Sequence, residues 1–435
     1  MPSFPDNVTS TNKNSYEKWY AELKTAVQKD SVNCYKYLNT YVNFFKDNHT
    51  DLSENKIYKP LDLQNDSIVN SFLQSEFYAQ QERVIVTSNY FKDRSKDSIE
   101  GIYELKDAYT IAIIKSPKMY RDYIGVIVKS NNPVWKPGDI KIELKREDSG
   151  LFSGYVYASN YTKITFRNHD MQFPLMGFKK KNTKPVLATT LSTTASFTVL
   201  NKNTTYLRIP DFSGNLYTEL QALYKEATPQ ITAHDNLIID VRGNGGGSDY
   251  NTTFLISLLY TNPIKTGKVE TFVTTDNIKH YENWLKVMEA DSANYSAASI
   301  ANQKEVIQQM KAIPLQTFYG FKEEGELTQP TSYKQPKNIV ILYDRGCASS
   351  CETLIYYAKQ SSKTTLMGQN SYGALGYGNN LGEMYTPNYN FLLTHSTTRH
   401  FHKRKYEIIG ISPDIRLNYQ QNWIDEALLV LENKK

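Results

Sequence analysis

The sequence predicts an α/β core, built on a mixed and largely parallel sheet with flanking helices, together with an N-terminal helical segment and a small all-β domain. Three observations lead to this prediction. After residue 191, short apolar runs of strand length alternate with helical patterns, which is typical of βαβ units. Residues 83–190 instead contain short alternating runs separated by turn residues, as in an antiparallel sandwich or barrel. The first 82 residues are dominated by helical periodicity.

The composition excludes several classes of protein. A chain of 435 residues is long for one domain, so two or three are expected. The 50 basic and 45 acidic residues give a net charge of only +5, without a long basic stripe, so nucleic acid is not expected as a partner. No apolar run reaches membrane-spanning length, and the first residues do not resemble a signal peptide. The chain is therefore either intracellular or lacks a signal that was removed, and its composition does not indicate an oligomeric state.

We expect three parts along the chain. The N-terminal helical segment covers 1–82, the small antiparallel β domain covers 83–190, and the α/β core covers 191–435. A stretch around 180–194, rich in lysine, threonine and serine, is typical of a linker. Within the core, 279–312 predicts a helical insertion. The simpler interpretation of this insertion is a surface helical pair, and the alternative is a lid over a cleft.

One polar turn in the core is a candidate for chemistry. The apolar run 338–343 predicts a strand and 352–359 predicts an amphipathic helix. A serine between a strand end and a helix N-terminus has its hydroxyl raised out of the core, beside unpaired backbone N–H groups. We therefore predict that Ser349 is a nucleophile. The alternative is that Ser349 or Ser350 only caps the helix, with help from Glu352.

A second apolar run ends in a glycine-rich loop. Residues 236–241 predict a buried strand, and three consecutive glycines follow within 243–247. Such a backbone can approach a substrate closely and present amide donors. We expect an oxyanion hole formed by the N–H of Ser350 and that of Gly245 or Gly246.

Together the two stretches resemble the core of the S41 peptidases, the family of the C-terminal processing proteases and the tricorn core protease. In that family an Asp-x-Arg-x-Asn-x-Gly-Gly strand precedes a Ser-x-Ser-Glu turn. Residues 240–247 carry the first string, and 349–352 carry the second with one substitution. The resemblance continues through 366–373 and 407–414. It implies a serine peptidase with a peptide or protein substrate, and neither a metal nor a cofactor is expected.

The resemblance also implies the other catalytic residues. In the processing-protease branch the base is a lysine in a Gly-Lys-Gly string, but the matching residue here is Ala374, which cannot accept a proton. The tricorn-like branch takes a histidine from an Asp-x-His-Thr string, which resembles 47–50, and a glutamate shortly before Gly-x-x-Pro-Asp. This implies His49 as the general base and Glu407 as the residue that orients it. The alternatives are a solvated loop histidine and a surface carboxylate.

The sequence is also compatible with other domain types and functions. Many S41 proteases carry a PDZ domain, but 83–190 contains no clear carboxylate-binding loop. The S41 core also occurs in retinoid-binding proteins of the eye, so the alternative function is a non-catalytic ligand- or peptide-binding protein. A third possibility is that the β domain recruits a partner or glycan while the core is inactive.

Family members usually work outside the cytoplasm, which implies a periplasmic or secreted protein. Cys347 and Cys351 are expected to pack the turn as small buried residues, with a disulfide as the alternative.

Overall fold

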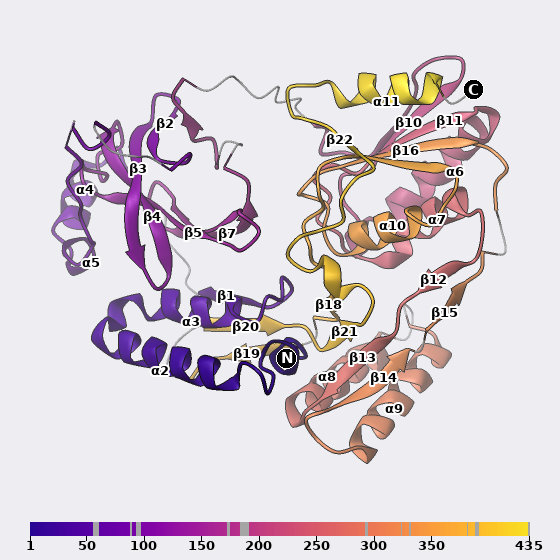
Figure 1. Cartoon of the computed structure of the whole chain (residues 1–435), viewed down its shortest axis with the longest axis horizontal. Coiled ribbons are helices and arrows are strands. Elements are labelled where there is room, and N and C mark those ends of the chain that lie inside the picture. The colour runs from indigo at the N-terminus through magenta and orange to yellow at the C-terminus, as the bar shows by residue number, and fades with distance from the viewer. Residues whose placement is uncertain are drawn as a thin grey trace. The chain divides into compact units, whose positions relative to one another are not determined.

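The computed structural model shows that the chain forms two compact units (Figure 1). Unit 1 comprises Met1–Lys18, Val42–Ser53 and Leu187–Lys435, and unit 2 comprises Trp19–Tyr41 and Glu54–Val186. Residues 1–82 are thus divided between the units, while the predicted boundary at 190 and most of the expected linker lie outside the described residues. The structure describes residues 1–54, 61–87, 89–92, 97–171, 175–182, 191–291, 295–322, 324–329, 332–380, 382–387 and 391–433.

The centre of unit 1 is a six-stranded sheet. Every neighbouring pair is parallel except β9 and β10, so the prediction of a mixed, largely parallel sheet is confirmed. No described helix of the chain is both long and apolar enough to cross a bilayer. In spatial order the strands are β22 (Ile415–Arg416), β17 (Thr364–Gly368), β16 (Asn338–Tyr343), β11 (Asn236–Asp240), β10 (Thr204–Arg208) and β9 (Ser196–Val199).

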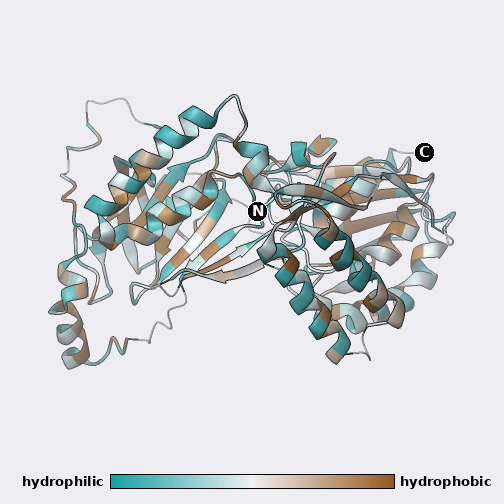
Figure 2. Ribbon diagram, turned by 90° about the horizontal axis from the view of Figure 1, so that it is seen from below, coloured by the Kyte–Doolittle hydropathy of each residue, from teal (hydrophilic) through white to brown (hydrophobic). Residues whose placement is uncertain are grey.

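Helices cover both faces of this sheet because its central strands are apolar on both faces. Alternate residues point to opposite sides: Ile239 and Ile341 pack into one core, and Ile238 and Val340 into another. The first core is closed by α6 (Tyr217–Ala233), α7 (Thr253–Leu259) and α10 (Ser350–Ala358), and the second by α11 (Trp423–Glu432) (Figure 1). Figure 2 shows hydrophobic residues along the strands between these helices.

The predicted helical insertion is also present in unit 1. It consists of α8 (Thr275–Ala290) and α9 (Ala297–Ala312), which share a buried core containing Tyr281, Val306 and Met310. Val273 and Tyr319 of a neighbouring sheet contribute to this core, so the pair is anchored to that sheet rather than lying loosely on the surface. That four-stranded sheet has the order β14 (Thr317–Lys322), β13 (Val269–Val273), β21 (Thr398–His400) and β18 (Tyr377–Gly378).

Smaller elements complete unit 1. A three-stranded sheet has the order β1 (Asp51–Glu54), β20 (Phe391–His395) and β19 (Gly382–Tyr385), and a two-stranded one joins β12 (Ile264–Thr266) to β15 (Gly325–Leu327). At the N-terminal end lie α1 (Ser3–Asn7), α2 (Lys13–Lys29) and α3 (Cys34–Asn43), and the residues of the last two are divided between the units.

Unit 2 is built on one seven-stranded antiparallel sheet. The prediction of an antiparallel β domain is correct, but the described residues of this unit form a single sheet and not a sandwich or closed barrel. A second sheet is unnecessary because Val69 and Tyr78, from α4 (Asp66–Leu73) and α5 (Glu76–Ala79), join the core on one face, while Val84 and Tyr90 pack on the other. The order is β7 (Lys163–His169), β6 (Phe152–Tyr157), β5 (Ile140–Arg146), β4 (Arg121–Ser130), β3 (Tyr109–Lys118), β2 (Gly101–Leu105) and β8 (Lys179–Lys180).

Candidate active site

Ser349 lies at the turn between β16 and α10, where the sequence predicted a nucleophile. Its φ of 53° and ψ of −117° are unusual for a residue with a side chain, and such a conformation costs on the order of 1–3 kcal/mol. The turn is nevertheless well fastened, since its Ala348 N–H donates to the Asn244 carbonyl at 3.0 Å. The Ser349 N–H donates to Glu352 Oε2 at 3.2 Å, so Glu352 contributes to capping as the alternative interpretation expected.

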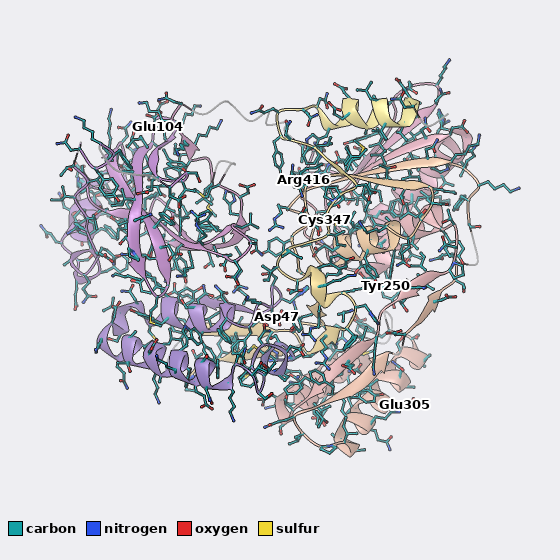
Figure 3. All side chains as sticks on the ribbon, in the orientation of Figure 1. Asp47, Glu104, Tyr250, Glu305, Cys347 and Arg416 are labelled. Atoms are coloured by element: carbon teal, nitrogen blue, oxygen red, sulfur yellow. A yellow bond between two sulfur atoms is a disulfide. The ribbon has the colours of Figure 1, made fainter. Side chains whose placement is uncertain are left out.

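A disulfide brackets the turn between β16 and α10, which we call the Ser349 turn. Cys347 and Cys351 are both fully buried, which confirms their packing role, and their sulfurs are bonded to each other, as the alternative interpretation proposed. Cys347 is labelled in Figure 3. The bond closes a ring that contains Ser349, so a covalent link constrains the Ser349 turn in addition to its hydrogen bonds.

His49 reaches this turn from the other end of the chain. Its Nε2 lies 3.2 Å from Ser349 Oγ, although the two residues are 300 positions apart. Burial lowers the pKa of the His49 imidazole below its ordinary value of 6.5, and the nearby Asp47 carboxylate opposes this effect. The imidazole is therefore neutral at pH 7, as a proton acceptor must be. The Tyr377 backbone also slightly favours the charged form, yet Nδ1 is buried and makes no hydrogen bond of ordinary geometry to any described group.

Asp47 holds the turn that carries His49. Its Oδ1 accepts the backbone N–H of His49 at 3.0 Å, and its Oδ2 accepts the hydroxyls of Thr50, at 2.8 Å, and Ser396. The side chain is only 3% exposed, and it is labelled in Figure 3. Asp47 opens the Asp-x-His-Thr string that led to His49, but it was not among the predicted catalytic residues.

Glu407 lies close to the histidine turn but contacts its backbone. One carboxylate oxygen accepts the N–H of Asn48 at 2.8 Å, and the other accepts those of Leu375 and Gly376 at 3.0 and 2.6 Å. None of these bonds goes to the imidazole, so direct orientation of His49 by Glu407 stays a prediction. Although the residue as a whole is partly exposed, its carboxyl group is enclosed, and burial together with Asp47 raises the pKa of Glu407 well above 4.5.

The glycine loop approaches the Ser349 turn very closely. A Cβ on Gly246 would lie 2.5 Å from the Ala348 carbonyl oxygen, and Gly246 has a φ of 92°. Only glycine fits here without a shift of the backbone. The N–H of Gly246 donates to Asn244 Oδ1 at 2.9 Å, so it is not available to bind an oxyanion. Of the predicted oxyanion donors, Gly245 and Ser350 remain, and both line the pocket described next.

The pocket in front of Ser349 has a volume of about 630 Å³. Its wall combines the histidine turn, the glycine loop, the first turn of α10 and β18. Most of the lining is polar or small, which suits a substrate held through its backbone. The lining residues are Asn48, His49, Gly245, Gly247, Asp249, Ala348, Ser349, Ser350, Thr353, Tyr372, Ala374, Leu375, Tyr377, Gly378, Asn379, Asn380 and His400.

Comparison with solved structures gives distant likenesses. CPAF in complex with lactacystin is 14% identical with a TM-score of 0.48, over 97% of this chain and 94% of that chain. The photosystem II D1 C-terminal processing protease is 12% identical with a TM-score of 0.34, over 94% and 87% of the two chains. A protein from Parabacteroides merdae ATCC 43184, described as a peptidase, is 16% identical with a TM-score of 0.35; the match spans 55% of this chain and 63% of that one.

Comparison with family models is more informative. No curated protein sequence matches the chain. Residues 203–417 match the model of peptidase family S41. This segment contains the six-stranded sheet except β9, and it carries the glycine loop, the Ser349 turn and Glu407. The α/β core of the chain therefore belongs to peptidase family S41.

Proposed function

We propose that the protein is a serine-type endopeptidase in which Ser349 attacks the carbonyl carbon of a peptide bond. The observation that carries this proposal is the 3.2 Å separation of Ser349 Oγ and His49 Nε2. A serine hydroxyl is a weak nucleophile until an adjacent base removes its proton. Because burial keeps His49 neutral at pH 7, its Nε2 has a lone pair available for that proton.

The proposed reaction has two halves. In the first, Ser349 Oγ bonds to the carbonyl carbon while its proton moves to His49 Nε2. The resulting oxyanion accepts hydrogen bonds from the N–H groups of Ser350 and Gly245. The C–N bond then breaks, and the imidazolium returns the proton to the leaving amine. In the second half, His49 activates a water that hydrolyses the acyl-enzyme and restores Ser349.

The buried carboxylates around His49 support this cycle. Asp47 places a negative charge near the imidazole and favours its protonated form during the reaction. Glu407 supports the histidine by holding the backbone of Asn48, the residue before it. We assign the supporting role of Glu407 to this backbone contact.

We also propose that the substrate is a peptide or protein that reaches the enzyme outside the cytoplasm. The polar pocket and the membership of family S41 support the first part. The buried disulfide between Cys347 and Cys351 supports the second, since disulfides persist mainly in oxidising compartments. Fractionation of the native host, with immunodetection of the protein, tests the location; a wholly cytoplasmic protein would contradict it.

Hydrolysis of an unstructured protein tests the activity. Casein or a quenched fluorescent peptide library should be cleaved by the native chain, and Ser349→Ala and His49→Ala should each lower the rate by about 10³-fold or more. His402→Ala is a matched control because His402 is an exposed histidine of the same unit, and its rate should be unchanged. Equal cleavage by Ser349→Ala and the native chain would refute the proposal. Binding of peptides without cleavage would favour the non-catalytic alternative.

A further inference from the structure

Four consecutive backbone N–H groups, those of residues 373–376, point at two buried carboxylates. We call residues 373–376 the amide strip. Gly373 and Ala374 donate to Glu352 at 2.8 and 2.7 Å. Leu375 and Gly376 donate to Glu407 at 3.0 and 2.6 Å. The two carboxylates therefore share one short segment of backbone between them.

Each carboxylate also binds one of the two turns that meet at the proposed active site. Glu352 accepts the N–H of Ser349 at 3.2 Å, and Glu407 accepts the N–H of Asn48 at 2.8 Å. Asn48 makes a second connection, because its Nδ2 donates to the Gly373 carbonyl at 2.8 Å. A continuous path of hydrogen bonds thus runs from the backbone of Ser349, through the amide strip, to the residue before His49.

Helix capping does not account for the surroundings of Glu352. A capping glutamate needs to reach only the N–H of the cap residue, and it can do so at the surface. Glu352 is fully buried and accepts three further donors, the third being the Ser371 hydroxyl at 2.6 Å. It forms no ion pair among the described residues, and burial raises its pKa. Burying an unpaired carboxylate costs free energy, and only a complete set of hydrogen bonds offsets this cost.

We propose that Glu352 is a positioning residue of the peptidase reaction, which fixes the backbone of Ser349 to the amide strip and thereby to the His49 turn. This inference rests on the proposed function, since it concerns the distance between nucleophile and base. Glu352 acts through the backbone of Ser349 and does not touch the reacting atoms.

The geometry predicts that glutamine cannot replace this glutamate. Oε1 accepts from Ser371 and Gly373, and Oε2 accepts from Ser349 and Ala374. In either orientation, the amide group of a glutamine would turn its own N–H bonds toward two donors. The isosteric change Glu352→Gln should therefore break the two hydrogen bonds at one carboxylate oxygen without altering the volume of the core.

The test measures the rate at which a fluorophosphonate labels Ser349, together with kcat and KM for peptide hydrolysis, all expressed per folded molecule. Glu352→Gln should lower the labelling rate and kcat by about 100-fold while KM changes by less than about threefold, because a nucleophile displaced by about 1 Å loses rate and not substrate contacts. Ser371→Ala removes one donor and should lower the labelling rate about fivefold. If Glu352→Gln does not fold, the labelling rate of Ser371→Ala tests the proposal, with the expected decrease of about fivefold.

The control is Glu143→Gln in unit 2. Glu143 is a buried carboxylate, 1% exposed, that accepts from Lys36, Arg121 and Tyr157. Its loss should destabilise the protein and leave the labelling rate per folded molecule unchanged. Native-rate labelling in Glu352→Gln, or in Ser371→Ala where only that variant folds, would overturn the inference while the proposed function stands. An unreactive native chain would instead refute the proposed function itself.

Discussion

The contact between the glycine loop and the Ser349 turn gives a quantitative prediction. An alanine at position 246 would place its Cβ 2.5 Å from the Ala348 carbonyl oxygen and 2.9 Å from the Ser349 Cβ. Ordinary contact begins near 3.4 Å, so the Ser349 turn and the glycine loop would have to separate by about 0.9 Å. The Ala348 oxygen is a backbone atom and the Ser349 Cβ is bonded directly to backbone, so neither atom can rotate out of the way.

Two costs follow from this geometry. The positive φ of Gly246 costs an alanine about 1–2 kcal/mol, and overpacking adds about 1–3 kcal/mol. The free energy of unfolding should therefore fall by about 2–5 kcal/mol. Because a displacement near 1 Å lowers catalytic rates by about 100-fold, labelling of Ser349 in the folded fraction should fall by that factor.

The same loop contains a matched control. Gly243 also has a positive φ, 74°, but an added Cβ would meet no atom of the described residues within 4 Å. Gly243→Ala should therefore show only the backbone cost of about 1–2 kcal/mol and label Ser349 at nearly the native rate. Urea unfolding measures the stability of both variants, and fluorophosphonate labelling reports the active site. Equal labelling of Gly246→Ala and Gly243→Ala would refute the close contact as the source of the effect.

Three further predictions address other parts of the molecule. Since burial lowers the pKa of His49 below 6.5, the labelling rate of Ser349 should be constant at neutral pH and fall only below pH 6.5; a rate that increases in acid would contradict a neutral base. Replacing both Cys347 and Cys351 by alanine opens a five-residue ring and should lower the free energy of unfolding, measured by urea titration, by about 2 kcal/mol. An unchanged free energy of unfolding would mean that the disulfide is absent in solution. In unit 2, burial lowers the pKa of Lys141 from 10.5 to about 7. Between pH 7 and pH 10.5 this lysine is therefore protonated in the unfolded chain but not in the folded chain. The free energy of unfolding should thus fall as the pH decreases from 10.5 to 7. Lys141→Met should remove this pH dependence and raise the free energy of unfolding at pH 7 by about 2 kcal/mol. If urea unfolding of the variant and of the native chain depended on pH in the same way, Lys141 would have its ordinary pKa.

Much of the core could be predicted because its signals are local. The runs at 236–241 and 338–343 are apolar and short, and they become adjacent parallel strands, β11 and β16. Ser349 could be located because a polar turn between strand and helix patterns is a local feature. The helical insertion at 279–312 could be predicted from periodicity alone, and its two helices begin and end within a few residues of the expected bounds.

What could not be predicted depends on contacts between distant residues. The pattern of unit 2 shows alternating strands, but whether a helix or a second sheet covers a face depends on residues such as Val69 that lie far away in the chain. Gly246 was an equal candidate for the oxyanion hole, because no local signal shows that its N–H is taken by Asn244. Likewise, Glu352 and Glu407 share the amide strip only after folding brings positions 48, 349 and 376 together.

The central claim is that His49 activates Ser349, and site mapping of a covalent adduct tests it most directly. The native protein is treated with a fluorophosphonate and digested, and the modified peptide is identified by mass spectrometry. The predicted result is one adduct on Ser349 that is abolished in His49→Ala and retained in His402→Ala. An adduct on Ser349 that forms equally fast without His49, or no adduct on Ser349 in the folded native protein, would contradict the claim.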